Sequence, residues 1–249
     1  MNFKTPQYLS FFQLKIKNSV LVKIRNMKKN RFLCATISLL WFATTHINAQ
    51  KFSVGASIGG NFQNITGTNQ NGDKVKNSLV LRFAVGVNGS MVLAPDYSAQ
   101  VGLLYATKGA SADISNVKVN LSYLEIPINL FYKPKLGNGK LMLGFGPYIG
   151  IGLGGSVKGD SNGSSYEQSV SYKKTITTTE NNSTSTAYFA PLDFGGNFIA
   201  GYEFDNGFSV QLNTQLGLTD INPTISGTTG DKTSVNNTGF GLSVGYKIK

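Results

Sequence analysis

Few side chains of this sequence could carry out chemistry. The stretch GIGLGG, from Gly150 to Gly155, matches the G-x-G-x-x-G pattern of dinucleotide-binding loops. That pattern needs a strand before it, a helix after it and an acidic residue about 20 positions further on. Here the glycines alternate with Ile151 and Leu153, and a segment rich in Ser and Thr follows. We therefore interpret these glycines as strand residues that clear space in a narrow interior.

Carboxylates are the other candidates for catalysis. Glu125, Asp193 and Glu203 could supply a general acid and base, although enzymes built on membrane barrels commonly combine Ser or Asp with His. The only histidine, His46, and the only cysteine, Cys34, both precede residue 50. If that leader is removed, the mature chain has no imidazole base, no thiol and no His or Cys metal ligand. We expect no enzyme activity, no cofactor and no metal site.

The leader has the pattern of a secretory signal peptide. Met27 begins MKKNR, which is followed by the apolar run FLCATISLLWFA and then by THINA, ending at Ala49. A basic start, a short apolar core and a small residue before the cleavage point are typical of such signals. The core is too short to cross a bilayer as a helix. We predict a signal peptide at residues 27–49 and a mature domain at residues 50–249, and we interpret residues 1–26 as an upstream extension that is not translated.

The net charge changes when the leader is set aside. The whole chain carries a formal charge of +11, which by itself suggests nucleic acid or an anionic surface as partner. Cleavage after Ala49 removes eight of the 23 Lys and Arg residues and none of the 12 Asp and Glu residues, which leaves +3. No nucleic-acid partner is therefore expected. All 29 glycines stay in the mature chain, whose charge content is low for a water-soluble surface.

Alternating apolar and polar residues predict strands throughout the mature chain. The connections at 94–96, 134–139 and 205–206 are short, whereas the others are long and rich in Asn, Gly, Ser and Thr. This alternation predicts an all-β fold, an eight-stranded antiparallel up-and-down transmembrane β-barrel with short periplasmic turns and long extracellular loops. The eight predicted strands are residues 52–64, 79–93, 97–109, 119–133, 140–155, 187–204, 207–219 and 238–249.

The charged residues within these strands share one face, opposite the apolar set. Their neighbours on that face are mostly Gly, Ser, Asn and Gln, which suit a narrow lumen better than a water-facing surface. Because an interior carboxylate must be paired, we predict that Glu125 contacts Arg82 or Lys108 inside the barrel. The predicted lumenal network consists of Arg82, Lys108, Glu125, Asp193 and Glu203.

Three prolines interrupt the predicted ladder. Pro127, Pro147 and Pro191 each remove a backbone N–H from a closed sheet, so bulges or lumenal water must compensate. The alternation also shifts between Tyr123 and Leu124, which predicts a bulge at that point.

Aromatic residues collect at the strand ends that border the short turns, on the apolar face. This is the position of a periplasmic aromatic girdle, with Phe62, Tyr123 and Tyr188 as candidates for the outer one. The periplasmic set is Phe52, Tyr97, Tyr132, Tyr202, Phe204, Phe208 and Tyr246.

The third long loop has the most distinctive composition. Residues 166–179 are rich in Thr, Val, Tyr and Ile with partial alternation, as if the strands on either side continued beyond the bilayer. An exposed sheet edge can recruit another strand, so this loop is a candidate binding surface for a protein or surface ligand; the alternative is a mobile, solvated loop. The candidate contact residues are Tyr166, Tyr172, Lys173 and Lys174.

Several motifs resemble the PorT-like outer-membrane β-barrel family of Bacteroidetes. They are YLEIPINLFYK, DFGGNFIAGYEF with its DNG turn, LGLTDINP, GGNFQNI and the terminal GLSVGYKIK. The resemblance covers essentially the whole mature chain and implies an eight-stranded barrel in the outer membrane. The family's namesake takes part in protein secretion across that membrane, so the resemblance implies a role in secretion.

Three functions remain open on the sequence alone. We expect a monomeric outer-membrane barrel in contact with outer-membrane lipids, with a role in structure, secretion or surface recognition. The alternatives are a soluble periplasmic or secreted lipocalin-like barrel that binds a small apolar ligand, and a small-solute channel. The barrel-insertion machinery is a further expected partner, for which Tyr246 substitutes for the terminal aromatic residue of many barrels because this chain ends in Ile248 and Lys249.

Overall fold

The computed structural model describes residues 52–112, 117–161, 163–228 and 230–248. The chain divides into two units, residues 1–50 and 51–249, and only the second contains described residues. The signal peptide and the upstream extension therefore lie outside the described residues and stay predictions. Within the described ranges, no helix is long and apolar enough to cross a membrane.

The described part of the chain is almost entirely β-structure. Its one helix is α2 (Thr178–Asn181). The strands are β1 (Phe52–Thr68), β2 (Asn77–Ser78), β3 (Val80–Ala94), β4 (Tyr97–Ala112), β5 (Val117–Tyr132), β6 (Gly139–Ser161), β7 (Ser164–Tyr172), β8 (Thr175–Ile176), β9 (Thr186–Phe189), β10 (Leu192–Phe204), β11 (Phe208–Gly217), β12 (Thr224–Ile225) and β13 (Ser234–Ile248).

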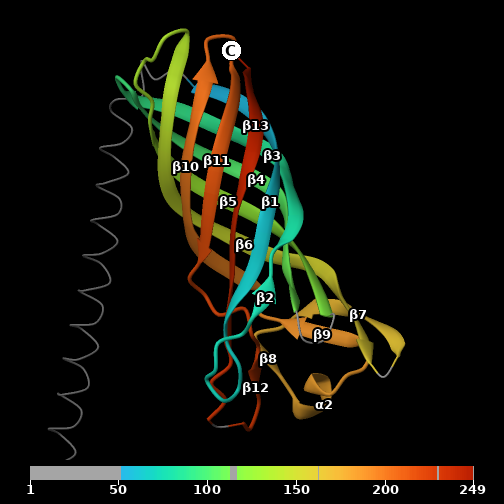
Figure 1. Cartoon of the computed structure of the whole chain (residues 1–249). Helices are drawn as coiled ribbons and strands as arrows, with labels where there is room; N and C mark the ends of the chain where they lie inside the picture. Colours follow the sequence, from blue (N-terminus) through green and yellow to red (C-terminus); the bar gives the residue numbers. More distant parts are fainter. Residues whose placement is uncertain (1–51, 113–116, 162, 229, 249) are drawn as a thin grey trace, which may run out of the picture. The chain divides into compact units, whose positions relative to one another are not determined.

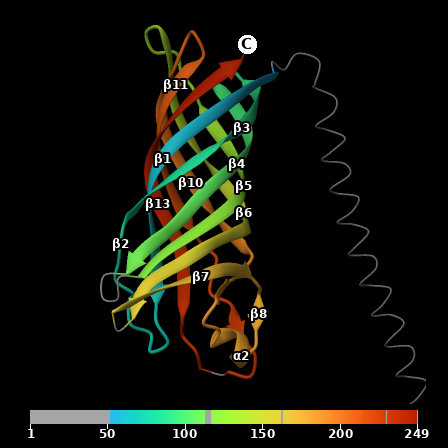
Figure 2. The ribbon, with the colours of Figure 1, turned by 90° about the vertical axis from the view of Figure 1, so that its right-hand side faces the viewer.

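The long strands pair antiparallel with their neighbours in the order β10-β11-β13-β1-β3-β4-β5-β6, and β6 pairs in turn with β10. The ladder therefore returns to the strand from which it started. The views in Figures 1 and 2, related by 90°, show these strands side by side around a common interior. Strands β7, β8, β9 and β12 gather with α2 at the end opposite the C-terminus (Figure 1). We call these short elements the loop module.

Seven of the eight predicted segments each correspond to one long strand, and the prediction for residues 187–204 is wrong. That segment consists of two strands, β9 and β10, separated at Ala190 and Pro191. Pro191 has no N–H to donate to a ladder, although its carbonyl accepts a bond from the N–H of Gly152 at 2.9 Å. Strand β9 leaves the ring at this point and pairs in parallel with β7.

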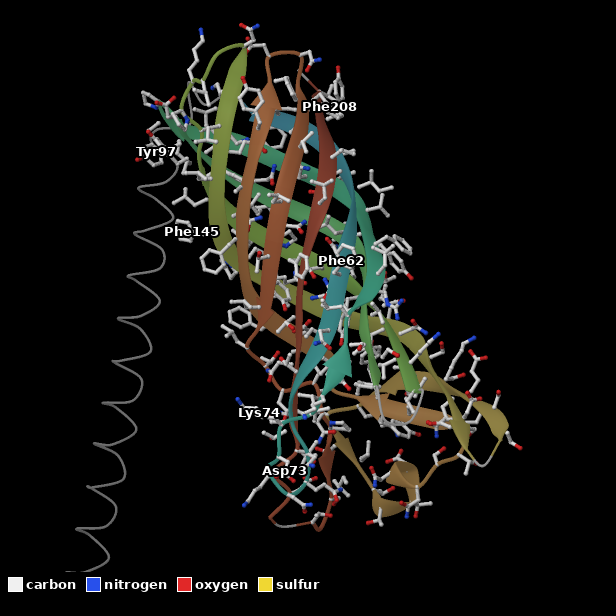
Figure 3. The ribbon with its side chains drawn as sticks, in the orientation of Figure 1. Phe62, Asp73, Lys74, Tyr97, Phe145 and Phe208 are labelled. Carbon is white, nitrogen blue, oxygen red and sulfur yellow. The ribbon has the colours of Figure 1, made fainter. Side chains whose placement is uncertain are left out.

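The outer face of the ring is apolar and the inner face is polar. Leu212 is 63 % exposed and Leu242 is 52 % exposed, whereas Glu125 and Asn129 are buried. Phe62 and Phe145, labelled in Figure 3, project from the outside of the ribbon. A lipocalin-like barrel needs the opposite arrangement, with apolar side chains around an interior ligand, so this alternative loses its main support.

An apolar cluster closes the interior at the end that carries the long loops. Its fully buried members include Leu121, Tyr123 and Ile221, against which Tyr172 and Phe189 of the loop module pack. The interpretation of Tyr123 as an outer girdle residue is wrong, because its side chain is 0 % exposed. The predicted shift after this residue is wrong as well. The irregularity lies in the β5–β6 pairing between Ser122 and Tyr123, where β6 carries the extra residue, so Tyr123 and Glu125 stay on the same inner face.

Candidate functional site

The middle of the lumen holds a buried group of three ionic side chains. The Nζ of Lys108 lies 3.0 Å from Oε2 of Glu125 and 2.9 Å from Oδ2 of Asp193. None of the three side chains is more than 6 % exposed. The sequence left Arg82 and Lys108 open as partners of Glu125, and the structure pairs Glu125 with Lys108.

Neutral donors add hydrogen bonds to both carboxylates of this group. One cation faces two carboxylates, so one negative charge is left over. The hydroxyl of Tyr148 donates to Oδ1 of Asp193 at 3.1 Å, and the amide of Asn237 donates to Oδ2 at 2.9 Å. Gln215 donates to Oε1 of Glu125 at 2.7 Å. Hydrogen bonds to charged groups are among the stronger ones in proteins, which makes an excess charge tolerable in this interior.

Strand register brings the two carboxylates together. Glu125 of β5 and Asp193 of β10 both pair with Gly150 of β6, so all three lie in one row across the sheet. A Cβ atom at Gly150 would stand 3.3 Å from the ring of Tyr123 and 3.5 Å from Cβ of Asp193. The first glycine of GIGLGG thus leaves room between two inward-facing carboxylates, and no helix follows that could present a dinucleotide.

A second ionic group lies at the lumen end bordered by the short turns. Glu203 accepts a bond from Nζ of Lys133 at 2.8 Å and pairs with Lys247. Here two cations face one carboxylate, and Lys247 is about one-third exposed. Sequence reasoning placed Glu203 in the lumen but missed Lys133 and Lys247 as its partners. Their position on the inward-facing side of the alternation was the signal that could have found them, and the same holds for Tyr148.

Arg82 does not join either group. Its guanidinium donates to the backbone carbonyls of Lys108 at 3.4 Å and Val119 at 3.1 Å, and to the side-chain oxygen of Asn120. The prediction that Arg82 belongs to the lumenal network is therefore wrong. The β3–β4 ladder is interrupted beside it, and the guanidinium bonds to residues of β4 and β5 across this interruption.

The lumen is filled rather than open. Two of its cavities, lined in part by Asn61 and Asn129, measure about 100 and 90 Å³. The apolar cluster described above covers the end with the long loops. Each lumenal carboxylate is held by a cation, so none is placed as a free acid or base. In the part of the chain that is described, no three His, Cys, Asp or Glu residues group in a way that could hold a metal ion.

The loop module is folded, and its four candidate contact residues differ in their surroundings. The Tyr172 ring lies 5.7 Å from that of Tyr123, and its hydroxyl donates to the carbonyl of Ser122 at 3.4 Å. Lys173 pairs with Glu180 of α2. Tyr166 and Lys174 are exposed. Tyr172 and Lys173 thus make contacts that hold the module together, and Lys173 is exposed like Tyr166 and Lys174.

The seven predicted girdle residues lie at the short-turn ends of their strands. Tyr97 and Tyr132 pair across β4 and β5 with ring centroids 5.2 Å apart, and the rings of Phe204 and Phe208 are 6.0 Å apart. Six of the seven are exposed, and Tyr202 is half-buried. Figure 3 shows Tyr97 and Phe208 at the opposite end of the strands from Asp73 and Lys74 of the first long loop.

A family model described as "Outer membrane protein beta-barrel domain" matches residues 48–222. The chain belongs to this family, and its place is therefore the outer membrane, where the apolar outer face meets lipid. No curated protein sequence matches the chain.

Several solved structures are similar in fold. One is the attachment invasion locus protein Ail of Yersinia pestis, solved in complex with the heparin analogue sucrose octasulfate. It is 12 % identical with a TM-score of 0.37, and the match covers 80 % of this chain and 99 % of the Ail chain. Neisserial surface protein A is 10 % identical with a TM-score of 0.39, covering 81 % and 100 %. The outer membrane protein OprG of Pseudomonas aeruginosa is 13 % identical with a TM-score of 0.41, covering 79 % and 95 %.

Proposed function

We propose that this chain is an eight-stranded transmembrane barrel of the interaction type, closed to solutes and without enzyme activity, which presents its loop module to a protein partner outside the cell. The pairing of β6 with β10 supports the barrel. The filled lumen and its apolar cover disfavour a solute channel. The aromatic rim at the short turns supports the orientation in which those turns face the periplasm.

The observation that carries the proposal is the attachment of the loop module to the barrel wall. Strand β6 extends past its pairing with β10 and forms a hairpin with β7, whose other edge pairs with β9. Thr177 caps α2 in a capping box with Glu180, and Tyr172 packs into the apolar cluster. Loops fixed in this way lose less conformational entropy on binding than mobile loops do.

The end of this sheet suits an extended peptide. Strand β9 is the last in the order β6-β7-β9, and terminal strands can accept a further strand from a partner. Of the four candidate residues, we assign Tyr166 and Lys174 to the contact with the partner. We assign Tyr172 and Lys173 to holding the surface in shape.

The partner class follows from location and resemblance. The likeness to the PorT-like family favours a protein that passes through or assembles at the outer membrane, and surface recognition of a protein is the alternative. We further propose that the barrel is a monomer and that the insertion machinery reads the strand ending near Tyr246.

Site-specific photo-crosslinking on intact cells tests this function. A photoreactive amino acid at Tyr166 should give a discrete protein adduct on illumination. The same amino acid at Asp73, in a different long loop at the same end of the barrel, is the matched control and should give none (Figure 3).

The outcomes of this test are decisive. An adduct that is lost on replacing Lys174 with Glu would support the module as the contact surface. Equal labelling at both positions, or no adduct at Tyr166, would overturn the proposal. Stepwise conductance of the purified barrel in planar bilayers would favour the channel instead.

A further inference from the structure

The β3–β4 ladder is interrupted toward the end with the long loops. These strands pair from Ala84 and Ala106 onward, and the next bridge is that of β2 with β4, at Ser78 and Ser111. Between these points, β3 pairs only with β1. The hydroxyl of Thr107 takes over part of the ladder, because it donates to the carbonyl of Phe83 and accepts from its N–H, both at 3.0 Å.

A groove of about 700 Å³ lies on the outer face along this interruption. Its wall is apolar over most of its length, with Ile58, Leu81, Phe83, Leu242 and Val244 among the lining residues. Gly60 of β1 lies in it, two residues from Phe62, which projects outward in Figure 3. A Cβ atom at Gly60 would meet only Cδ1 of Leu81, at 3.8 Å, so the absence of a side chain there leaves the wall hollow.

One end of the groove is polar and cationic. Arg82 reaches Asn120 at this end, where Thr107 and Ser122 also line the groove. Lys118 lies two residues from Asn120 on β5, so both side chains point to the same face of the strand, and Lys118 is exposed. Arg82 therefore lines this end beside neutral hydrogen-bonding groups, and Lys118 lies just beyond the groove, next to Asn120 on the same strand face.

Neither cation is neutralised within the described part of the chain. Arg82 donates only to uncharged oxygens, those of Leu81, Lys108, Val119 and Asn120. Among the described residues, no salt bridge includes Arg82 or Lys118. A guanidinium at the border of an apolar band is costly without an anion. Four of the five N–H groups of Arg82 already bond to these oxygens, so one N–H, on Nη1, is left to donate a charge-assisted hydrogen bond to a phosphate oxygen.

We infer that this groove binds a phosphate-bearing lipid of the outer leaflet, with an acyl chain against Leu81 and Phe83 and the phosphate on Arg82 and Lys118. The inference rests on the barrel orientation proposed above, and it is independent of the protein partner at the loop module. The apolar wall accounts for the acyl chain. The two cations, which have no anion among the described residues, account for the phosphate. Gly60 accounts for the close fit of one acyl chain at this place.

Native mass spectrometry of the purified barrel in detergent micelles tests the site. The probes are phosphatidic acid with two oleoyl chains and the matched diacylglycerol, which lacks the phosphate. Wild-type protein should retain phosphatidic acid about tenfold better than diacylglycerol, because one charged hydrogen-bonded contact corresponds to roughly that factor. The double variant Arg82→Met and Lys118→Met should lose this preference.

Two glycine variants distinguish lipid binding in the groove from nonspecific binding of lipid to the outer face. Gly60→Leu fills the groove and should reduce retention of both lipids at least about fivefold, since a single methylene in an apolar site already changes affinity severalfold. Gly196→Leu is the matched control. This glycine of β10 pairs with Pro147 and Leu216, and a Cβ atom there would meet nothing within 4 Å.

Three results would overturn the site: equal retention of the two lipids by wild type, an unchanged preference in the double variant, or the same retention by Gly60→Leu and Gly196→Leu. Heat-dependent migration in gels shows whether each variant is folded. If the double variant does not fold, Lys118→Met alone and Gly60→Leu still decide the question. Failure of the lipid site leaves the crosslinking result at Tyr166 unaffected, so the two proposals can fail separately.

Discussion

The lumen and the loop module use the same ion-pair chemistry in opposite surroundings. In the lumen, Lys108 and its two carboxylates are almost completely shielded from solvent. In the loop module, the side chains of Lys173 and Glu180 are 49 % and 26 % exposed. Coulomb attraction strengthens as the effective dielectric falls, and so does the penalty for a charge left alone. The lumenal group should therefore decide whether the barrel folds, and the exposed pair should only adjust the shape of a surface.

Removal of the central lumenal cation should have the largest effect on stability of any single substitution in these two regions. Lys108→Met leaves two carboxylates buried without a cation, and we expect the free energy of unfolding to fall by about 3–5 kcal/mol. Urea titration of the barrel refolded into detergent micelles, followed by far-ultraviolet circular dichroism, would measure this change.

Two matched variants sharpen that result. The triple variant Lys108→Met, Glu125→Gln and Asp193→Asn removes the unbalanced charges and should regain most of the loss. Lys247→Met, in the second ionic group, should cost only about 1 kcal/mol or less, because this lysine is partly exposed and Lys133 still pairs with Glu203. A cost for Lys108→Met no larger than that for Lys247→Met would contradict the contrast between buried and exposed pairs.

The barrel wall was predictable because lipid on one side and a narrow lumen on the other enforce a strict two-residue period. That period located the long strands and the inward-facing Lys108, Glu125 and Asp193. It could not rank Arg82 against Lys108 as the partner of Glu125. Both lie on inward-facing positions, and only the interruption of the β3–β4 ladder directs Arg82 away.

The loop module was less predictable, since its contacts join segments far apart in the sequence. Thr224 and Ile225 of β12 pair in parallel with Thr175 and Ile176 of β8. Nothing in either dipeptide indicates the other. The same limit explains why the prediction for Tyr123 was wrong. An aromatic residue near a strand end has the sequence pattern of a girdle residue. The burial of Tyr123 depends on Tyr172, almost 50 positions further on.

Tyr172 connects the two regions, so its removal should give an intermediate effect. We expect Tyr172→Ala to lower the free energy of unfolding by about 2 kcal/mol, because a half-buried ring and its packing on Tyr123 are lost. Hydrogen exchange should increase in β7 and β9 while β4 and β5 keep their protection. Tyr166→Ala, in the same strand but exposed, is the control and should change stability by less than about 0.5 kcal/mol.

The exposed pair of the loop module should have the smallest effect, and that effect should depend on pH. The Lys173 ammonium, with the N–H of Thr177, lowers the pKa of Glu180 below its usual value of 4.5. A carboxyl whose pKa is lower in the folded state stabilises that state at pH values above its unfolded pKa. The contribution is lost as the pH falls through the folded pKa, so α2 should lose protection only in the acid range below 4.5.

Hydrogen exchange of the α2 amides between pH 6 and pH 3, corrected for the intrinsic rates, measures this dependence. Glu180→Gln keeps an acceptor for the N–H of Thr177 but cannot ionise, so its α2 protection should be lower at pH 6 and should not change on acidification. The lumenal strands of the same samples supply the internal reference. If α2 and the barrel strands lose protection together at acid pH, the Lys173–Glu180 pair does not act on the loop module alone. That result would contradict the contrast between the buried lumenal group and the exposed pair.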